Sequence, residues 1–205
     1  MGRQARRIGV EIDADVEQRK LIIFEEAAKA FAENGVQFTS VNDIAARLNV
    51  AKPSVYHYVS GKDALIDGVI EVAQRRIAPL RRTVDQSGPT ALDRLRVLMR
   101  EIVMRAASDP FTQCMARMDR HSLKPQQRER HRQLQHGLVN YVADIIRQGI
   151  DDGSIQPCNP TLQSFSLLGS VINVTRWYDS TGPFTLDEIA EQIAQPLING
   201  LSTRS

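Results

Sequence analysis

The chain has 205 residues, of which 42% are hydrophobic and 24% are charged, and its formal net charge at pH 7 is +2. This composition supports a real hydrophobic core and excludes both an intrinsically disordered chain and a surface coated with positive charge. Because no apolar run approaches the roughly 18 residues of a membrane span and the N-terminus lacks a signal-peptide core, we expect a cytoplasmic protein without membrane association.

Basic residues crowd the N-terminus. Arg3, Arg6 and Arg7 precede an acidic stretch between Glu11 and Glu17. One interpretation is a solvated, disordered tail, because blocks of charge commonly behave so. The other is an arm that reaches phosphates or the minor groove of DNA, as homeodomain arms do.

A helix-turn-helix pattern follows a first helix that spans residues 24–34 and stops at Asn34-Gly35. Ser40 and Asp43 form a capping-box pattern at the start of the next helix. Asn49 ends that helix, because after glycine it is the residue that best tolerates the left-handed backbone conformation found there. Pro53 stands in the first turn of a further short helix. The apolar stripe of the first helix of the pair is Val41, Ile44, Ala45 and Leu48.

The second helix of the pair has an inner apolar face, Val55 and Val59, and a basic, hydroxyl-rich and aromatic outer face. Such a helix, held by a capped partner, is what a helix-turn-helix inserts into the major groove. The sequence therefore predicts binding to double-stranded DNA. The predicted outward residues are Lys52, Ser54, Tyr56, His57 and Tyr58.

The same segment resembles the DNA-binding domain of the tetracycline-repressor family of bacterial regulators. The resemblance covers roughly residues 15–70, and the matching positions are Thr39, Ser40, Ile44, Ala45, Val50, Tyr56, Tyr58, Lys62, Asp63 and Leu65. The chain departs from the family pattern at Asn49, Ala51, Val55 and Val59. Ala51 matters most, because a capping hydroxyl is worth about 1 kcal/mol and alanine has none.

DNA contacts are predicted on two grounds. Lys52 and Tyr56 project from the second helix, so we expect base-edge or phosphate contacts from both. The resemblance implies that Thr39, Ser40, Tyr58 and Lys62 hold phosphates and fix the register on the duplex.

The rest of the chain is predicted to be helical, which gives an all-α fold of about nine helices. We expect residues 1–62 to form the arm and a three-helix DNA-binding domain, and residues 63–205 to form a ligand-binding and dimerisation domain. Arg81–Pro89 is expected to be a turn-rich linker. The remaining predicted helices are 63–78, 91–108, 110–118, 125–152, 160–178 and a capped helix that starts after Thr185.

The last two predicted helices are strongly apolar. The run Leu162–Val174 and the stripe Ile189–Leu201 would expose too much apolar surface on a single soluble chain. In the resembled family the corresponding helices form a four-helix dimer interface. We therefore expect a homodimer, which would present two recognition helices to a palindromic operator.

The helices that start near Ala91, Pro125 and Asn159 are expected to enclose an apolar cavity. Arg176 and Trp177 end an apolar helix, where they are either an ordinary helix terminus or part of a ligand pocket. The tail from Trp177 is similar to the ends of regulators in this family that respond to acyl-CoA thioesters. The predicted ligand contacts are Met99, Val103, Tyr141, Ile145, Arg176 and Trp177.

Three other features carry less specific signals. The basic cluster Lys124–Arg132 is a solvated helix face or a partner for CoA phosphates. Neither the histidines nor Cys114 and Cys158 show a metal-binding or nucleophile motif, so we expect no metal, no cofactor and reduced thiols.

The predicted function is that of a ligand-responsive transcriptional regulator, a repressor released by a small apolar ligand. The alternatives are an architectural or constitutive DNA-binding factor that senses no ligand, and a helical enzyme. About 140 residues beyond the DNA-binding motif exceed what dimerisation alone needs, which favours a sensor.

Overall fold

The structure is a computed structural model that describes residues 16–203, and these residues fold mainly into α-helices. Among them the only other regular elements are the 3-10 turn η1 (Arg120–Ser122) and a single β-bridge between Ile155 and Ser202. The predicted all-α fold class is confirmed. The helices are α2 (Val16–Asn34), α3 (Val41–Arg47), α4 (Lys52–Tyr56), α5 (Lys62–Arg75), α6 (Ile77–Asp85), α7 (Ala91–Ser108), α8 (Pro110–Arg117), α9 (Pro125–Asp151), α10 (Pro160–Ile172), α11 (Val174–Trp177) and α12 (Leu186–Asn199).

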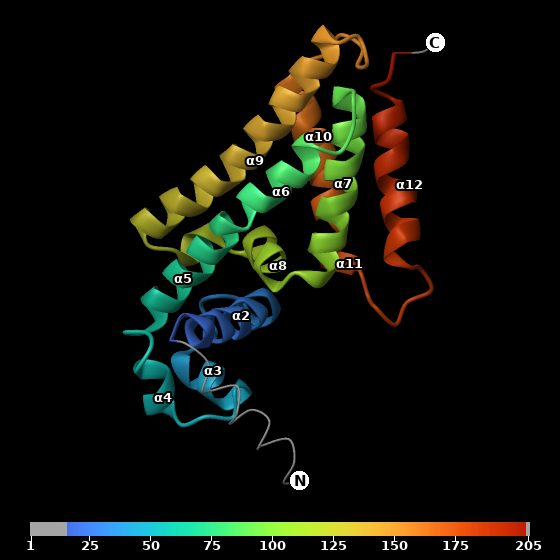
Figure 1. The fold of residues 1–205 in the computed structure, drawn as a ribbon. Coiled ribbons are helices and arrows are strands. Elements are labelled where there is room, and N and C mark those ends of the chain that lie inside the picture. Colours follow the sequence, from blue (N-terminus) through green and yellow to red (C-terminus); the bar gives the residue numbers. More distant parts are fainter. Residues whose placement is uncertain (1–15, 204–205) are drawn as a thin grey trace.

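The helices pack around two hydrophobic cores, and α3 and α4 lie at one end of the molecule (Figure 1). The first core joins α2, α3 and α4 to α5 and α8, where Ile44, Leu65 and Phe111 are fully buried. The second core joins α6, α7, α9, α10 and α12 around Leu98. Because α5 and α8 complete the first core, the predicted boundary after Lys62 marks the end of the helix-turn-helix motif and not the end of its core.

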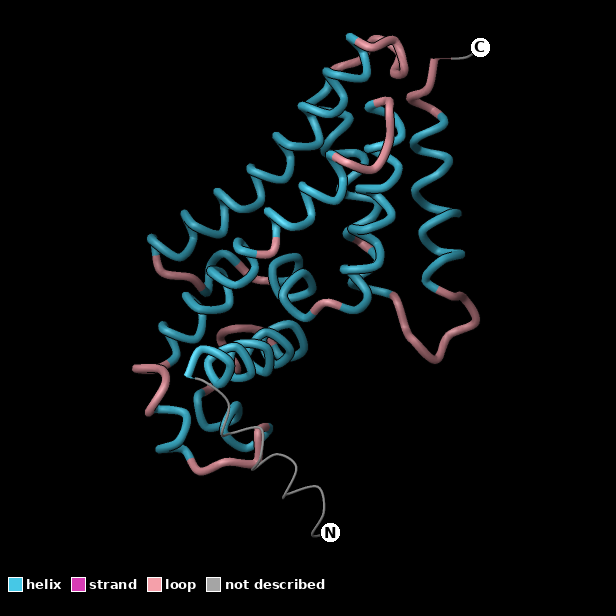
Figure 2. The backbone as a smooth tube through the Cα atoms, in the orientation of Figure 1, coloured by secondary structure: helices cyan, strands magenta, loops and turns pink. Residues whose placement is uncertain are grey.

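The tube in Figure 2 shows loops only at the ends of helices, and most of these ends lie where the sequence predicts them. Helix α7 begins after the capping residue Thr90, whose hydroxyl accepts a hydrogen bond from the Asp93 amide at 3.2 Å. Helix α12 begins in the same way, with Thr185 accepting from the Glu188 amide at 3.2 Å. These reciprocal caps satisfy backbone donors that a helix start leaves unpaired.

Helix α6 is a departure from the prediction, which ended a helix at residue 78 and placed a linker over Arg81–Pro89. Helix α5 instead ends at Arg75, and a new helix, α6, runs from Ile77 to Asp85 with Pro79 in its first turn. Proline cannot donate to the carbonyl four residues earlier, that of Arg75, and its ring clashes with it. The break therefore falls before the proline, whose own position suits the start of a new helix.

The predicted helix 160–178 is divided into α10 and α11 by Asn173, which is the C-cap of α10. The apolar run continues through the break, so its periodicity gives no sign of it. Asparagine is a weak helix former because its side chain competes for backbone groups. This division and α6 account for the helices that the sequence did not predict.

The two cysteines are free thiols within the described part of the chain. Cys114 is buried in the first core, and burial raises the pKa of its thiol to about 12, so this thiol is unreactive near neutral pH. No helix in residues 16–203 has the length and apolar character needed to cross a bilayer. The same residues contain no group of three or more His, Cys, Asp or Glu side chains placed to hold a metal ion.

Candidate nucleic-acid interface and ligand cavity

Helix α3 and the turn after it have the local geometry that the sequence predicts. The Asp43 carboxylate accepts a hydrogen bond from the Ser40 amide at 2.7 Å, and the Ser40 hydroxyl accepts from the Asp43 amide at 3.3 Å. Asn49 has a left-handed backbone, with φ of 54°. Ala51 precedes α4 without a side-chain cap, so α4 depends on packing for its position.

Packing fixes the helix-turn-helix pair on α2 and α5. Val55 and Val59 are buried in the first core, with exposed fractions of 1% and 5%. Arg47, in the last turn of α3, pairs with Glu26 at 2.5 Å and with Glu33 at 2.7 Å, both on α2. The hydrogen bonds to these two carboxylates raise the pKa of Arg47.

The outer face of α4 presents the predicted recognition residues to solvent. Lys52, Ser54, Tyr56 and His57 are exposed, and the Lys52 ammonium lies 5.5 Å from the centroid of the Tyr56 ring. Tyr58 is half-buried, and its hydroxyl accepts a hydrogen bond from Arg19 at 2.6 Å. Cationic, hydroxyl and aromatic groups therefore share one surface at the end of the molecule that carries α3 and α4 (Figure 1).

The two predicted phosphate contacts that flank α3 and α5 differ in their surroundings. The Lys62 ammonium, at the start of α5, donates to the Gln37 carbonyl at 3.2 Å and is half-buried. Thr39 has an exposed fraction of only 2%, and its hydroxyl donates to the Gly35 carbonyl at 2.9 Å. This burial argues against a phosphate contact by the Thr39 side chain; the residue instead fixes the turn that precedes Ser40.

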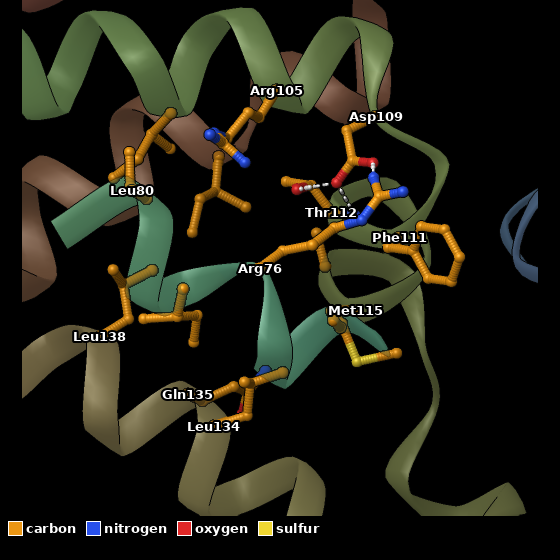
Figure 3. Close-up of a pocket in the computed structure, with 15 residues that line it drawn as sticks. Arg76, Leu80, Arg105, Asp109, Phe111, Thr112, Met115, Leu134, Gln135 and Leu138 are labelled. Carbon is orange, nitrogen blue, oxygen red and sulfur yellow. Dashed lines mark hydrogen bonds and ion pairs between the residues drawn. The ribbon is translucent and has the colours of Figure 1, made fainter. Parts of the chain in front are cut away.

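A cavity of about 210 Å³ lies between the joint of α5 and α6 and the helices α7, α8 and α9 (Figure 3). Its wall is largely apolar, with a few polar groups at one end. The apolar side chains include Leu80, Ile102, Phe111, Met115, Leu134 and Leu138, and the polar ones are Arg76, Arg105, Asp109, Thr112 and Gln135.

An ion pair between Arg76 and Asp109 closes the polar end of this cavity (Figure 3). Asp109 also caps α8, since its carboxylate accepts from the Thr112 amide at 3.0 Å, while the Arg76 guanidinium lies 4.4 Å from the centroid of the Phe111 ring. Arg105 also lines the cavity, and its buried Nε makes no hydrogen bond but forms an ion pair with Glu101 at 3.6 Å. The cavity wall thus contains a second arginine that is paired within the chain.

A second cavity of about 350 Å³ adjoins the first. The two share Ala116, Gln135, Leu138 and Ile172 in their walls, and the second extends to Arg176. Their joint position between α8, α9 and α10 makes them two parts of one hollow region.

The predicted ligand residues are mostly outside these cavities. Met99, Val103 and Ile145 are packed in the second core and line neither cavity, and Trp177 is 47% exposed at the end of α11. Among the six, only Arg176 lines a cavity wall. The apolar stripes of the sequence did not mark the wall of the first cavity, because that wall comes mainly from α8 and the α5–α6 joint.

Tyr141, the remaining predicted ligand residue, has a structural partner instead. Its hydroxyl donates to the Asp85 carboxylate at 2.7 Å, and the Arg81 guanidinium lies 4.5 Å from its ring centroid. Burial, together with this hydrogen bond, raises the pKa of Tyr141. Tyr141 therefore joins α9 to α6, and its hydroxyl hydrogen is used within the chain.

The basic cluster at the start of α9 is also engaged within the chain. Lys124 pairs with Asp63 at 2.6 Å and Arg130 pairs with Asp67 at 2.5 Å, which joins α9 to α5. The hydrogen bond from Lys124 lowers the pKa of Asp63. The predicted N-terminal arm of Arg3, Arg6 and Arg7 lies outside the described residues.

The exposed apolar surface is on α10 and not on α12. Leu162 and Phe165 are 65% and 56% exposed, one turn apart on α10, and we call this pair the α10 apolar face. The predicted stripe of α12 is used within the chain, because Ile189 and Ile198 are buried in the second core. Within the described residues of these two helices, the large exposed apolar side chains are therefore on α10, while Ile193 and Leu197 of α12 are half-buried.

Comparison with known proteins agrees with this architecture. Residues 23–69 match the family described as bacterial regulatory proteins of the tetR family, and residues 88–201, more than half of the chain, match the tetracyclin repressor-like C-terminal domain. The transcriptional repressor KstR2 of Mycobacterium tuberculosis is 25% identical, over 93% of this chain and 96% of its own length.

Solved structures share the fold at lower identity. The ketosteroid regulator KstR2 of Mycobacterium tuberculosis superimposes with a TM-score of 0.80 at 22% identity, covering 91% of this chain and 96% of that one. AibR, solved in complex with isovaleryl coenzyme A and operator DNA, superimposes with a TM-score of 0.76 at 24% identity, covering 90% and 98%.

Proposed function

The chain belongs to the tetracycline-repressor family of bacterial regulatory proteins, and from this premise we propose that it is a repressor that binds a palindromic operator as a homodimer and is released by a small apolar ligand. The observation that carries the proposal is the position of Arg76. This residue stands at the joint of α5 and α6 and lines the cavity, while α5 begins at Lys62 beside the recognition helix. A ligand in the cavity would therefore contact the helix that supports the DNA-binding surface.

DNA contact is assigned to the outer face of α4 and to the residues that flank it. Lys52 and Tyr56 reach base edges from α4, while Ser40 and Lys62 contact phosphates on either side. Phosphate contacts fix the position of the protein on the duplex, and base-edge contacts select the sequence. The exposure of Lys52 and Tyr56 supports this division.

The dimer is assigned to α10. Its apolar face, Leu162 and Phe165, would be covered by the same face of a second chain, because a symmetric dimer uses one surface twice. Gly169 lies one turn beyond Phe165 and is also exposed, so two α10 helices can approach closely there. The outer side of α12, which carries exposed Gln192, would form a polar rim.

The ligand class follows from the cavity wall. The first cavity, of about 210 Å³, has room for a short apolar group, and the adjoining cavity of about 350 Å³ has room for a further part of the ligand. The side-chain donors of Arg105 and Gln135 in the wall add a preference for a hydrogen-bond acceptor, such as a carbonyl oxygen. A short acyl group, as in an acyl-CoA thioester, has both features.

The coupling between ligand and DNA is assigned to α5. This helix of 14 residues, roughly 21 Å long, is joined to the cavity by Arg76 and to α9 by the pairs of Asp63 and Asp67. A ligand that separates Arg76 from Asp109 would shift α5, and the shift would change the spacing of the two recognition helices. The ligand must prefer this DNA-incompetent state for binding to release the operator.

A second candidate is a constitutive or architectural DNA-binding factor, which would bind DNA in the same way but ignore any ligand. The two hypotheses differ only in whether occupancy of the cavity changes the affinity for DNA. A helical enzyme, the third hypothesis, would require turnover of a substrate.

The proposal is tested by titrating the purified protein into fluorescent DNA from the flanks of its own gene and into mixed-sequence DNA. Mass spectrometry under native conditions would identify any small molecule that copurifies, and adding it back should weaken binding to the flanking DNA. Equal affinity for both DNAs, or no effect of the molecule, would contradict the proposed repressor.

We predict that Lys62→Ala weakens binding to every DNA sequence alike and flattens the slope of log affinity against log salt by about 1. The reason is that Lys62 contacts phosphate and releases a counterion there, without reading a base. Lys29→Ala is the matched control, since Lys29 already pairs with Glu25 on the outside of α2. A Lys62→Ala variant with the wild-type salt slope would contradict the assignment.

A further inference from the structure

Phe38 has the largest exposed fraction, 75%, of the large apolar side chains in the described part of the chain. It lies in the turn between α2 and α3, where Val36 and Thr39 are buried while Gln37 is exposed. Val36 is 3% exposed and Thr39 is 2% exposed in the same turn. Single exposed apolar residues are common, so exposure alone assigns no role to Phe38.

The turn around Phe38 is fixed by hydrogen bonds at both of its ends. The Gly35 amide donates to the Phe31 carbonyl at 3.0 Å, and the Thr39 hydroxyl donates to the Gly35 carbonyl at 2.9 Å. Gly35 itself has a φ of 86°, a left-handed conformation that glycine adopts without strain. The exposure of Phe38 is therefore imposed by an ordered backbone and does not result from a frayed segment.

The position of Phe38 relative to the proposed phosphate contacts is the second observation. Gln37, the residue before it, accepts the hydrogen bond of the Lys62 ammonium at 3.2 Å. Ser40, two residues after it, is the N-cap of α3 and is exposed. In the sequence, Phe38 thus lies between Gln37, whose carbonyl holds Lys62, and Ser40, and we assign Lys62 and Ser40 to the DNA backbone.

We propose that Phe38 packs against the deoxyribose of the operator backbone, beside the phosphates held by Ser40 and Lys62. The sugar is the apolar part of the backbone, and a phenyl ring can remove it from water without a donor or acceptor of its own. The contact would strengthen binding to any duplex sequence, because sugars carry no base identity. This inference rests on the proposed DNA-binding function.

The salt dependence distinguishes this contact from a phosphate contact. Loss of a cation that touches phosphate weakens binding and also flattens the salt slope, because fewer counterions are released. Loss of an apolar contact weakens binding but leaves the number of released counterions unchanged. Phe38 and Lys62, although neighbours in space, therefore have different expected signatures.

The experiment compares the wild type with Phe38→Ala and Phe38→Leu by fluorescence anisotropy, on DNA from the flanks of the gene and on mixed-sequence DNA, at several salt concentrations. We expect Phe38→Ala to lower the affinity about tenfold on both DNAs with the wild-type salt slope, and Phe38→Leu to recover part of the loss. Lys62→Ala, measured beside them, should lower the slope.

Phe184→Ala is the matched control, because Phe184 is 62% exposed in the loop before α12, outside the proposed DNA surface and outside α10. It should bind DNA like the wild type. Thermal unfolding and light scattering of each variant show whether the fold and the assembly are retained.

Wild-type affinity in Phe38→Ala would overturn this inference without touching the proposed function. A lower molecular mass in that variant would do the same, because it would place Phe38 in a protein contact. A flatter salt slope in Phe38→Ala would also overturn it, since the ring would then act through charges. Failure of the wild type to bind any DNA at low salt would refute the proposed function as well, so the two failures are distinguishable.

Discussion

A Phe165→Glu variant is expected to scatter light with the mass of one chain, 23.0 kDa, whereas the wild type is expected to scatter with the mass of two. In the proposed dimer, Phe165 lies under the α10 face of the partner, so a carboxylate there would lose its contact with water; Phe165 also lines the second cavity, whose wall includes Arg176. Burial of an unpaired charge costs several kcal/mol, which exceeds what a small apolar face returns. In the single chain the side chain is 56% exposed, so the fold itself should tolerate the change.

The same variant should lose most of its affinity for a palindromic operator. Two linked DNA-binding modules gain roughly 10²–10⁴-fold over one, and a single chain can occupy only one half-site. Asn140→Glu is the matched control, because it adds the same charge to an exposed position on α9. A Phe165→Glu variant that still scatters as two chains would place the dimer contact elsewhere.

The sequence predicted the helix-turn-helix correctly because local chemistry determines it. Ser40 and Asp43 satisfy each other's backbone amides, and Asn49 takes the left-handed backbone that ends α3. The outward face of α4 follows from the inward direction of Val55 and Val59. Each of these features depends on residues a few positions apart, so a pattern can reveal it.

The structure departs from the expectations where contacts outside a helix's own periodic pattern decide the position of a side chain. The prediction for Thr39 came from a family resemblance, yet its hydroxyl is directed into the turn by the carbonyls of Ala30 and Gly35. The stripe of α12 was correctly read as apolar, but α7 covers it within the same chain, and a periodic pattern cannot say which helix is the partner.

The ligand cavity illustrates the same limit. A cavity is space that side chains fail to fill, so the strongest apolar stripes belong to the core and not to its wall. Met99 and Val103 have the helical spacing of a binding face but are fully buried in the second core. The lining residues Arg76 and Asp109 lie at two helix breaks, one before Pro79 and one before Pro110. The two prolines are visible in the sequence, but the sequence does not show that the two breaks lie close together in space.

The second large effect that we expect comes from filling the cavity with protein atoms. Ala116 lines both cavities, so Ala116→Leu would place a larger apolar side chain where the ligand is proposed to bind. If the filled cavity favours the state that releases DNA, the variant should bind the operator roughly 5–150-fold more weakly without any ligand, the range of ordinary coupling free energies. Fluorescence anisotropy on the operator fragment measures this change directly.

Overpacking alone could weaken the fold by about 1–3 kcal/mol, so the thermal midpoint of the variant must be measured beside its affinity. Ala107→Leu is the matched control, since Ala107 is half-buried on α7 and lines neither cavity. The copurified ligand should also bind Ala116→Leu less tightly than the wild type, because the added atoms occupy its place. An Ala116→Leu variant that keeps the wild-type thermal midpoint and the wild-type operator affinity would show that the cavity is not coupled to DNA. The chain would then be the constitutive DNA-binding factor of the second hypothesis.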